Sequence, residues 1–195
     1  MRQKVTFMDK NKYLSLIIPL LKEEGRGLSM DAVAQKIGVT KKTLYNQFVS
    51  KDQMIEECLK MVSAQFRASL SCMDGESVPV EKRFADGVTT LRLYFREMSR
   101  VFMRDLMEYY PQKASLDHTA GSAYFEEKIS ENIEEGKRRG VYRPDIDSSL
   151  FAKYIAFSIF SFFQKEVMMR NTYSADHYFE QVIKFNINAL LIKQQ

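Results

Sequence analysis

The chain is poor in residues that break helices and in residues that cross-link chains or bind metals. Its 195 residues include four prolines, eight glycines, two cysteines and two histidines. The shortage of helix breakers, together with apolar residues mostly three to four positions apart, predicts an all-α protein. The two cysteines, Cys58 and Cys72, do not suggest a disulfide framework, so the cytoplasm is the expected compartment.

The motifs of common catalytic and cofactor sites are also missing. There is no glycine-rich phosphate loop, His-Glu-x-x-His helix or Cys-x-x-Cys pair. His118 and His177 are far apart in the sequence, and Cys58 is better explained as a small buried residue than as an oxidant sensor. We therefore expect no enzyme, no cofactor and no metal. No apolar run reaches bilayer length without polar interruption, and we expect no signal peptide and no membrane partner.

What the chain does have is a pattern of two short helices joined by a tight turn within residues 28–54. Ser29 and Thr40 are suited to cap the two helices, because their hydroxyls accept backbone N–H groups that the first turn leaves free. Gly38 can end the first helix in the left-handed conformation. A turn this short makes the helices cross steeply and buries Leu44 against the first helix.

The opposite face of the second helix is polar. It carries cations, hydroxyls and amides, the groups that bond DNA phosphates and base edges: Lys41, Lys42, Thr43, Tyr45, Asn46 and Gln47. We expect Lys41, Thr43 and Asn46 to lie against the major groove. Residues 1–50 carry nine Lys/Arg and four Asp/Glu, so the net charge of +4 comes from this part of the chain. The alternative is a solvated, lysine-bearing helix in an ordinary bundle.

The run from Ser29 to Ile55 resembles the signature of the TetR family of bacterial transcriptional repressors. The matching positions are Ser29, Ala34, Gly38, Val39, Thr43, Leu44, Tyr45, Phe48, Ser50, Lys51 and Asp52. The resemblance covers about the first quarter of the chain. It implies a helix-turn-helix DNA-binding domain at residues 1–50, helped by the start of the next helix to about residue 54, and an effector-binding and dimerisation domain at residues 51–195.

The resemblance also implies roles for individual residues of the first domain. Thr40, Tyr45 and Lys51 match family positions that contact the DNA backbone. The complete DNA-binding set expected from the face and the resemblance together is Ser29, Thr40, Lys41, Lys42, Thr43, Tyr45, Asn46 and Lys51.

Further helices are expected along the rest of the chain. The first, at residues 10–24, contains Pro19, which should kink it without ending it. Pro111 should end a helix, and residues 113–121 read as a loop. The remaining helices are expected at residues 50–70, 80–97, 100–109, 125–139, 148–169 and 175–192.

The last two of these helices are too apolar for one chain to cover easily. The helix at 148–169 is apolar nearly all round, and the helix at 175–192 has a broad apolar stripe. A two-fold partner could cover them in a four-helix interface, and the resemblance implies the same homodimer. The expected interface residues are Phe157, Phe160, Ile183 and Leu190. The alternative is a pair of ordinary core helices.

Aromatic and methionine residues are concentrated in the middle of the chain. They suggest an effector cavity between the helices at 80–97, 100–109 and 125–139, although a packed core is an equal alternative. The expected lining is Phe66, Arg92, Phe95, Met98, Phe102, Met103, Tyr109 and Tyr124. Arg92 also belongs to a repeat every four residues with Arg96, Arg100 and Arg104, which is either an anion-binding stripe or a solvated face.

Together these patterns predict a ligand-responsive, DNA-binding transcriptional regulator. We expect a repressor that binds double-stranded DNA at a palindromic operator as a homodimer and is released by a small-molecule effector. The alternative is a helical interaction protein of the same fold that does not bind an operator.

Overall fold

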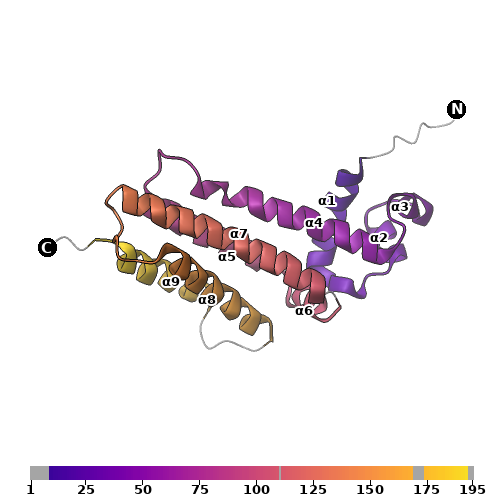
Figure 1. Cartoon of the computed structure of the whole chain (residues 1–195). Helices are drawn as coiled ribbons and strands as arrows, with labels where there is room; N and C mark the ends of the chain where they lie inside the picture. Colours follow the sequence, from indigo (N-terminus) through magenta and orange to yellow (C-terminus); the bar gives the residue numbers. More distant parts are fainter. Residues whose placement is uncertain (1–8, 110, 169–173, 193–195) are drawn as a thin grey trace. The chain divides into compact units, whose positions relative to one another are not determined.

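The computed structural model describes residues 9–109, 111–168 and 174–192, and in this part of the chain the fold is all-α (Figure 1). The only strand-like feature noted there is an isolated bridge between Tyr142 and Leu191. The elements are α1 (Lys10–Glu24), η1 (Gly25–Gly27), α2 (Met30–Lys36), α3 (Lys41–Gln47), α4 (Lys51–Ser69), η2 (Leu70–Met73), α5 (Val80–Arg96), α6 (Arg100–Tyr109), α7 (Pro111–Arg138), α8 (Ser148–Met168) and α9 (Ala175–Leu190).

Pro19 lies inside α1 without ending it. The apolar face of the helix continues past it, since Ile17, Ile18 and Leu21 are all buried. Burial of that face holds the helix together although proline removes one of its hydrogen bonds. α1 therefore has the bounds expected from the sequence.

The predicted loop at residues 113–121 is wrong. These residues belong to α7, which begins at Pro111 and runs without a break to Arg138. Proline is well suited to the first position of a helix, where its missing N–H would have no partner in any case. Pro111 therefore starts this helix instead of only ending the previous one.

The chain divides into two compact units. We call the first unit the head, which comprises the described residues within 1–64 and 98–110; the second unit is the body, within 65–97 and 111–195. The head thus extends beyond the boundary expected at residue 50. It includes the first part of α4, where Met54, Ile55 and Cys58 are buried, and it also includes α6.

The body is built from η2, α5, α7, α8 and α9 around one apolar core. Its centre contains Phe84, Leu91, Phe125 and Ile155, none of which is exposed. Close packing is visible at Gly136 of α7, where a Cβ atom would lie 2.1 Å from Cδ2 of Tyr142. Any side chain at this position would collide with the ring.

Two polar side chains, Asn132 and Arg83, are buried within the body. Asn132 donates a hydrogen bond to the carbonyl of Val80 at 2.9 Å and accepts one from the Tyr142 hydroxyl at 3.4 Å. Arg83 donates to the carbonyl of Met73 at 3.1 Å, and its guanidinium lies 3.9 Å from the Glu135 carboxylate. Burying a polar group without a hydrogen-bonding partner costs free energy, so these contacts fix the position of α5 relative to α7 and η2.

Candidate nucleic-acid interface

The two helices of the motif begin at the caps expected from the sequence. The Ser29 hydroxyl accepts the N–H of Ala32 at 3.1 Å, and the Thr40 hydroxyl accepts the N–H of Thr43, also at 3.1 Å. Between them Gly38 has a φ of +74°, a conformation that glycine adopts without strain. α2 and α3 are short, and these caps satisfy donors that their first turns leave free.

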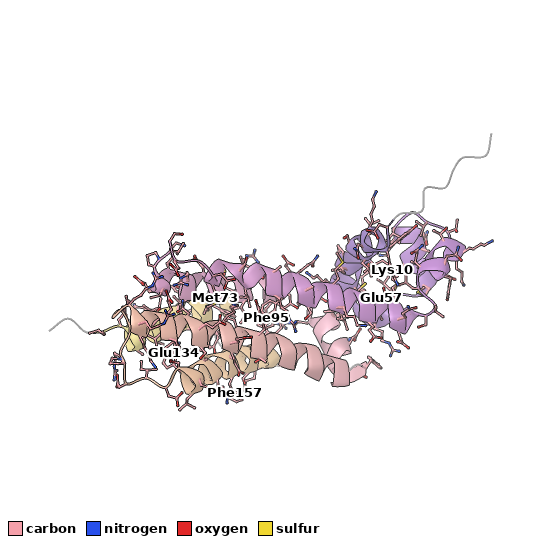
Figure 2. All side chains as sticks on the ribbon, turned by 45° about the horizontal axis from the view of Figure 1, so that its top comes forward. Lys10, Glu57, Met73, Phe95, Glu134 and Phe157 are labelled. Atoms are coloured by element: carbon pink, nitrogen blue, oxygen red, sulfur yellow. The ribbon has the colours of Figure 1, made fainter. Side chains whose placement is uncertain are left out.

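α3 is anchored by its apolar face. Leu44 and Phe48 are fully buried in the head. Lys10 of α1 lies over the ring of Phe48, with its Nζ 5.2 Å from the ring centroid, and forms an ion pair with Glu57 of α4 at 2.6 Å (Figure 2). The end of α3 therefore contacts α1 through Phe48, and α1 is in turn tied to α4.

The outward face of α3 is polar, as the sequence predicts. Lys41, Lys42, Tyr45 and Asn46 are exposed, while Thr43 is half-buried and shares a 2.8 Å hydrogen bond with the Thr40 hydroxyl. This arrangement presents two ammonium groups, a phenol and an amide on one surface. Such groups can bond both phosphate oxygens and base edges in the major groove.

Lys41 has an intramolecular partner. Its Nζ donates to the Asp31 carboxylate of α2 at 2.9 Å, which raises the pKa of Lys41. The same Nζ lies 5.8 Å from the centroid of the Tyr45 ring. An ammonium group has three donors, so Lys41 can keep this contact and still donate to a phosphate or a base.

Lys51, at the start of α4, is in a different environment from the other residues of the expected DNA-binding set. It is half-buried, and its Nζ donates to the backbone carbonyl of Arg26 in η1. Burial, helped by the nearby positive charge of Arg26, lowers the pKa of Lys51. Lys51 therefore connects α4 to η1 through one of its three donors.

The turn between α3 and α4 also exposes a residue that the sequence did not single out. Val49 is 82% exposed, and its N–H donates to the Gln53 side chain at 2.7 Å. The Ser50 hydroxyl accepts the N–H of Gln53 at 3.1 Å and so caps the start of α4. The cap is a local feature that the sequence can signal, but exposure of Val49 depends on the tertiary turn.

The residues expected to line an effector cavity are divided between the two units. Met98, Phe102 and Tyr109 belong to the head, and the side chain of Met103 lies outside the described residues. The body residues of the set are Phe66, Arg92, Phe95 and Tyr124.

The body residues of that set have close neighbours. Phe95 is buried, with its ring stacked on Phe163 at a centroid distance of 3.9 Å and edge-on to Phe160 at 5.3 Å. Arg92 donates to Asp176 of α9 at 2.8 Å. The rings of Phe95, Phe160 and Phe163 are therefore packed against one another, and a ligand that bound here would have to separate them.

The arginine repeat does not form one continuous stripe on one helix. Arg92 and Arg96 lie on α5 in the body, whereas Arg100 and Arg104 lie on α6 in the head. The chain leaves its helical conformation between the two pairs, and the hydroxyl of Ser99 caps α6 by accepting the N–H of Phe102 at 3.0 Å.

A cavity of about 290 Å³ lies on the body between α7 and α8. It is more acidic than the expected effector site and lacks aromatic residues. Its lining is Ala123, Glu126, Glu127, Ser130, Glu131, Ser149 and Ala152.

The expected dimer residues differ in how accessible they are. Phe157 is 75% exposed on α8 (Figure 2), and Phe160 and Ile183 are half-buried. Leu190 is fully buried within its own chain, so its expected place on an interface is wrong. Its carbonyl accepts the N–H of Arg143 at 2.8 Å, which holds the end of α9 in the body.

Other large apolar side chains on α8 and α9 are exposed as well. Leu150 and Tyr154 are two turns and one turn before Phe157 on α8, and Phe185 is 64% exposed on α9. α8 and α9 are neighbours, because the Tyr178 hydroxyl donates to the carbonyl of Ser158 at 2.7 Å and the Phe162 and Tyr178 rings stack at 3.7 Å. We call Leu150, Tyr154, Phe157 and Phe185 the apolar stripe.

Two further properties of the described residues bear on function. Among the described residues, no group of three or more His, Cys, Asp or Glu side chains is arranged to hold a metal ion. In the same part of the chain, no helix is both long and apolar enough to cross a membrane.

Comparison with known proteins agrees with the geometry of the head. Residues 19–58 match the family model described as bacterial regulatory proteins, tetR family. Over 193 residues the chain is 22% identical to the uncharacterised HTH-type transcriptional regulator YvaF of Bacillus subtilis (strain 168), covering 96% of this chain and 98% of that protein.

Solved structures share the whole fold at low sequence identity. A transcriptional regulator from Saccharomonospora viridis in complex with choline superimposes with a TM-score of 0.78 at 15% identity, covering 94% of this chain and 98% of that chain. NalD of Pseudomonas aeruginosa, the secondary repressor of the MexAB-OprM multidrug efflux pump, gives a TM-score of 0.61 at 18% identity, covering 95% and 100%.

The capped helix-turn-helix in an all-α chain defines a transcriptional regulator of the helix-turn-helix class. More narrowly, residues 19–58 match the tetR family of bacterial regulatory proteins, which places the similarity in the helix-turn-helix and the helices beside it. The fold and the family are those of transcriptional regulators, which are generally not enzymes.

Proposed function

We propose that the protein is a ligand-responsive repressor that binds operator DNA through the outward face of α3. The observation that carries this proposal is the arrangement of α3 itself. Leu44 and Phe48 are buried, while Lys41, Lys42 and Asn46 are exposed on the opposite side. A helix anchored this firmly, with phosphate- and base-bonding groups turned outward, suits the major groove.

The proposed contacts fall into two kinds. Lys41, Thr43 and Asn46 reach base edges, while Lys42 and Tyr45 bond phosphates together with the N-terminal hydroxyls of Ser29 and Thr40. Lys51 also bonds a phosphate, through the two N–H donors of its ammonium group that do not bond the Arg26 carbonyl. Such a regulator works where the bacterial chromosome lies, in the cytoplasm.

Assembly as a homodimer is the second part of the proposal. The apolar stripe exposes four large apolar side chains on two neighbouring helices, and extensive exposed apolar surface marks interaction sites. Packing α8 and α9 against the same helices of a second copy would bury the stripe in a four-helix interface. Two heads related by a two-fold axis would then read a palindromic operator.

Release by a small molecule is the third part. The body residues Phe66, Phe95 and Tyr124, with Arg92 at the edge, offer apolar rings and one cation, which is the composition of many ligand sites. Because the Phe95 and Phe163 rings are stacked on each other, the effector would bind a conformation of the body in which these rings are separated. The regulator from Saccharomonospora viridis is described in complex with choline, which supports a small organic effector.

Selection from a random pool of duplex DNA by the full-length protein tests the proposal. We expect enrichment of one sequence with two inverted half-sites. Choline and other small organic compounds can then be added to the complex to find those that release the selected DNA. If no sequence is enriched over repeated rounds at low salt, the protein is not an operator-binding regulator.

A further inference from the structure

α6 is joined to the head by a buried hydrogen bond between residues far apart in the sequence. The Asp105 carboxylate accepts the backbone N–H of Arg26 at 2.8 Å, across a separation of 79 residues. Asp105 is 9% exposed, and its other oxygen lies 3.4 Å from the Arg104 guanidinium. A carboxylate this buried is costly without donors, so its position is tied to the η1 turn.

The approach of α6 to η1 is close enough to require glycine at the turn. Gly25 has a φ of +67°, and a Cβ atom built on it would lie 2.5 Å from Asp105 Oδ2 and 2.8 Å from a methyl carbon of Val101. Only a residue without a side chain allows both the left-handed backbone and this contact. Gly25 and Asp105 therefore fit each other.

Two further contacts hold the ends of α6 to the same segment. Before the helix, the N–H of Ser99 donates to the carbonyl of Lys22 near the end of α1 at 3.1 Å. At the end of the helix, the Arg26 guanidinium lies 4.5 Å from the centroid of the Tyr109 ring. α6 is thus attached to α1 and η1 along its whole length.

η1 is in turn attached to the start of α4. The carbonyl of Arg26 accepts the bond from Lys51, and the Arg26 guanidinium lies 3.7 Å from the Asp52 carboxylate. Lys51 and Asp52 directly follow the turn after α3. Arg26 therefore stands between Asp105 on one side and the residues that fix the end of the helix-turn-helix on the other.

We propose that Asp105 is a positioning residue for operator binding. Its carboxylate fixes η1, and η1 holds Lys51 and the start of α4 in place beside α3. Asp105 does not touch DNA in this account, and its effect reaches DNA only through Arg26 and Lys51. The inference rests on the proposed function, because it concerns the same DNA-binding head.

The experiment compares the full-length Asp105→Ala and Asp105→Asn variants with wild type. Three quantities are measured: affinity for the selected operator, hydrogen exchange of the Arg26 amide, and the midpoint of thermal unfolding. Loss of one charge-assisted hydrogen bond should weaken operator affinity in Asp105→Ala about tenfold and speed Arg26 exchange by about the same factor. Asp105→Asn should keep most of both, since its amide oxygen can accept the same bond.

Removing an acidic group also makes the protein more attractive to DNA in general. Glu76→Gln in the body, at an exposed carboxylate, is the matched control for this charge change. It should leave Arg26 exchange unchanged and should not weaken operator binding. Weaker binding by Asp105→Ala would therefore oppose the effect expected from charge alone.

A second pair of variants covers the case in which Asp105→Ala fails to fold. Tyr109 is 49% exposed, so Tyr109→Ala should fold while losing the contact with Arg26. It should weaken operator binding severalfold, and Tyr109→Phe should restore it because the ring face remains. Wild-type operator affinity in Tyr109→Ala and, where it folds, in Asp105→Ala, with Arg26 exchange unchanged, would overturn the inference. A wild-type protein that selects no DNA would instead contradict the proposed function.

Discussion

Phe157→Glu is expected to separate the dimer without unfolding the protomer. Phe157 is 75% exposed in the protomer, so a glutamate there remains in water and costs the single chain little. In the proposed dimer the same position is buried against the partner. The variant therefore tests the assembly and not the stability of the helix.

The size of the effect follows from the exposed area. Burying a phenylalanine fully is worth about 1.5–3 kcal/mol, and three quarters of this side chain is available, so each copy contributes about 1–2 kcal/mol. Two-fold symmetry doubles this to about 2–4 kcal/mol, which corresponds to a dissociation constant raised about 30- to 700-fold. A buried carboxylate adds a further cost on top of the lost apolar contact.

Sedimentation velocity over a range of concentrations measures the change, with circular dichroism to show that the helices remain. Leu16→Glu is the matched control, because Leu16 is 43% exposed on α1 in the head, outside the apolar stripe. We expect wild type and Leu16→Glu to sediment as dimers at micromolar concentration and Phe157→Glu as a monomer. A dimeric Phe157→Glu with the wild-type dissociation constant would show that the stripe is not the interface.

Three further predictions concern the head. Thr40→Ala should destabilise it by about 0.5–2 kcal/mol and Thr40→Ser by much less, measured by urea unfolding, because only alanine removes the α3 cap. Lys42→Ala should weaken binding to all DNA sequences and lower the slope of log affinity against log salt concentration by about one. Lys60→Ala, at an exposed lysine on α4, should leave that slope unchanged. Burial raises the pKa of the Cys58 thiol to about 12, so little reactive thiolate is present at this residue in folded protein at pH 8. Cys58 should therefore react with thiol reagents far more slowly than Cys72 does, and unfolding in denaturant should abolish the difference in rate.

Local signals predicted the head well. Ser29 and Thr40 cap the helices that their sequence positions indicate, and Gly38 has the left-handed conformation expected of a helix terminator. Each of these features depends on a few neighbouring residues, so a single sequence is enough to predict it. The polar face of α3 follows for the same reason, from the helical period and the burial of Leu44.

Features that depend on distant contacts were missed. The bond from Arg26 to Asp105 joins residues 79 positions apart, and nothing near Asp105 in the sequence points to η1. For the same reason the sequence assigned α6 to the second domain, although its contacts place it in the head.

Hydrophobic patterns showed which faces are apolar but not what covers them. Phe157 and Leu190 both lie on apolar faces of helices near the end of the chain, yet Phe157 is exposed and Leu190 is fully buried. The difference arises because the end of α9 is held in the body, where the N–H of Ile192 donates to the carbonyl of Val141 at 3.1 Å. Periodicity alone cannot distinguish burial within a chain from burial between chains.

The most direct test of the central claim is the DNA preference of Asn46→Ala compared with wild type in parallel selections from one random pool. Asn46 is exposed on the outward face of α3, where an amide can bond an adenine edge in the major groove. If α3 reads the operator, the two selected sequences should agree except at one position in each half-site, where the variant's preference is relaxed and the lost discrimination is about 1–3 kcal/mol. An identical preference at every position in both selections would show that α3 does not read the bases in the way proposed here.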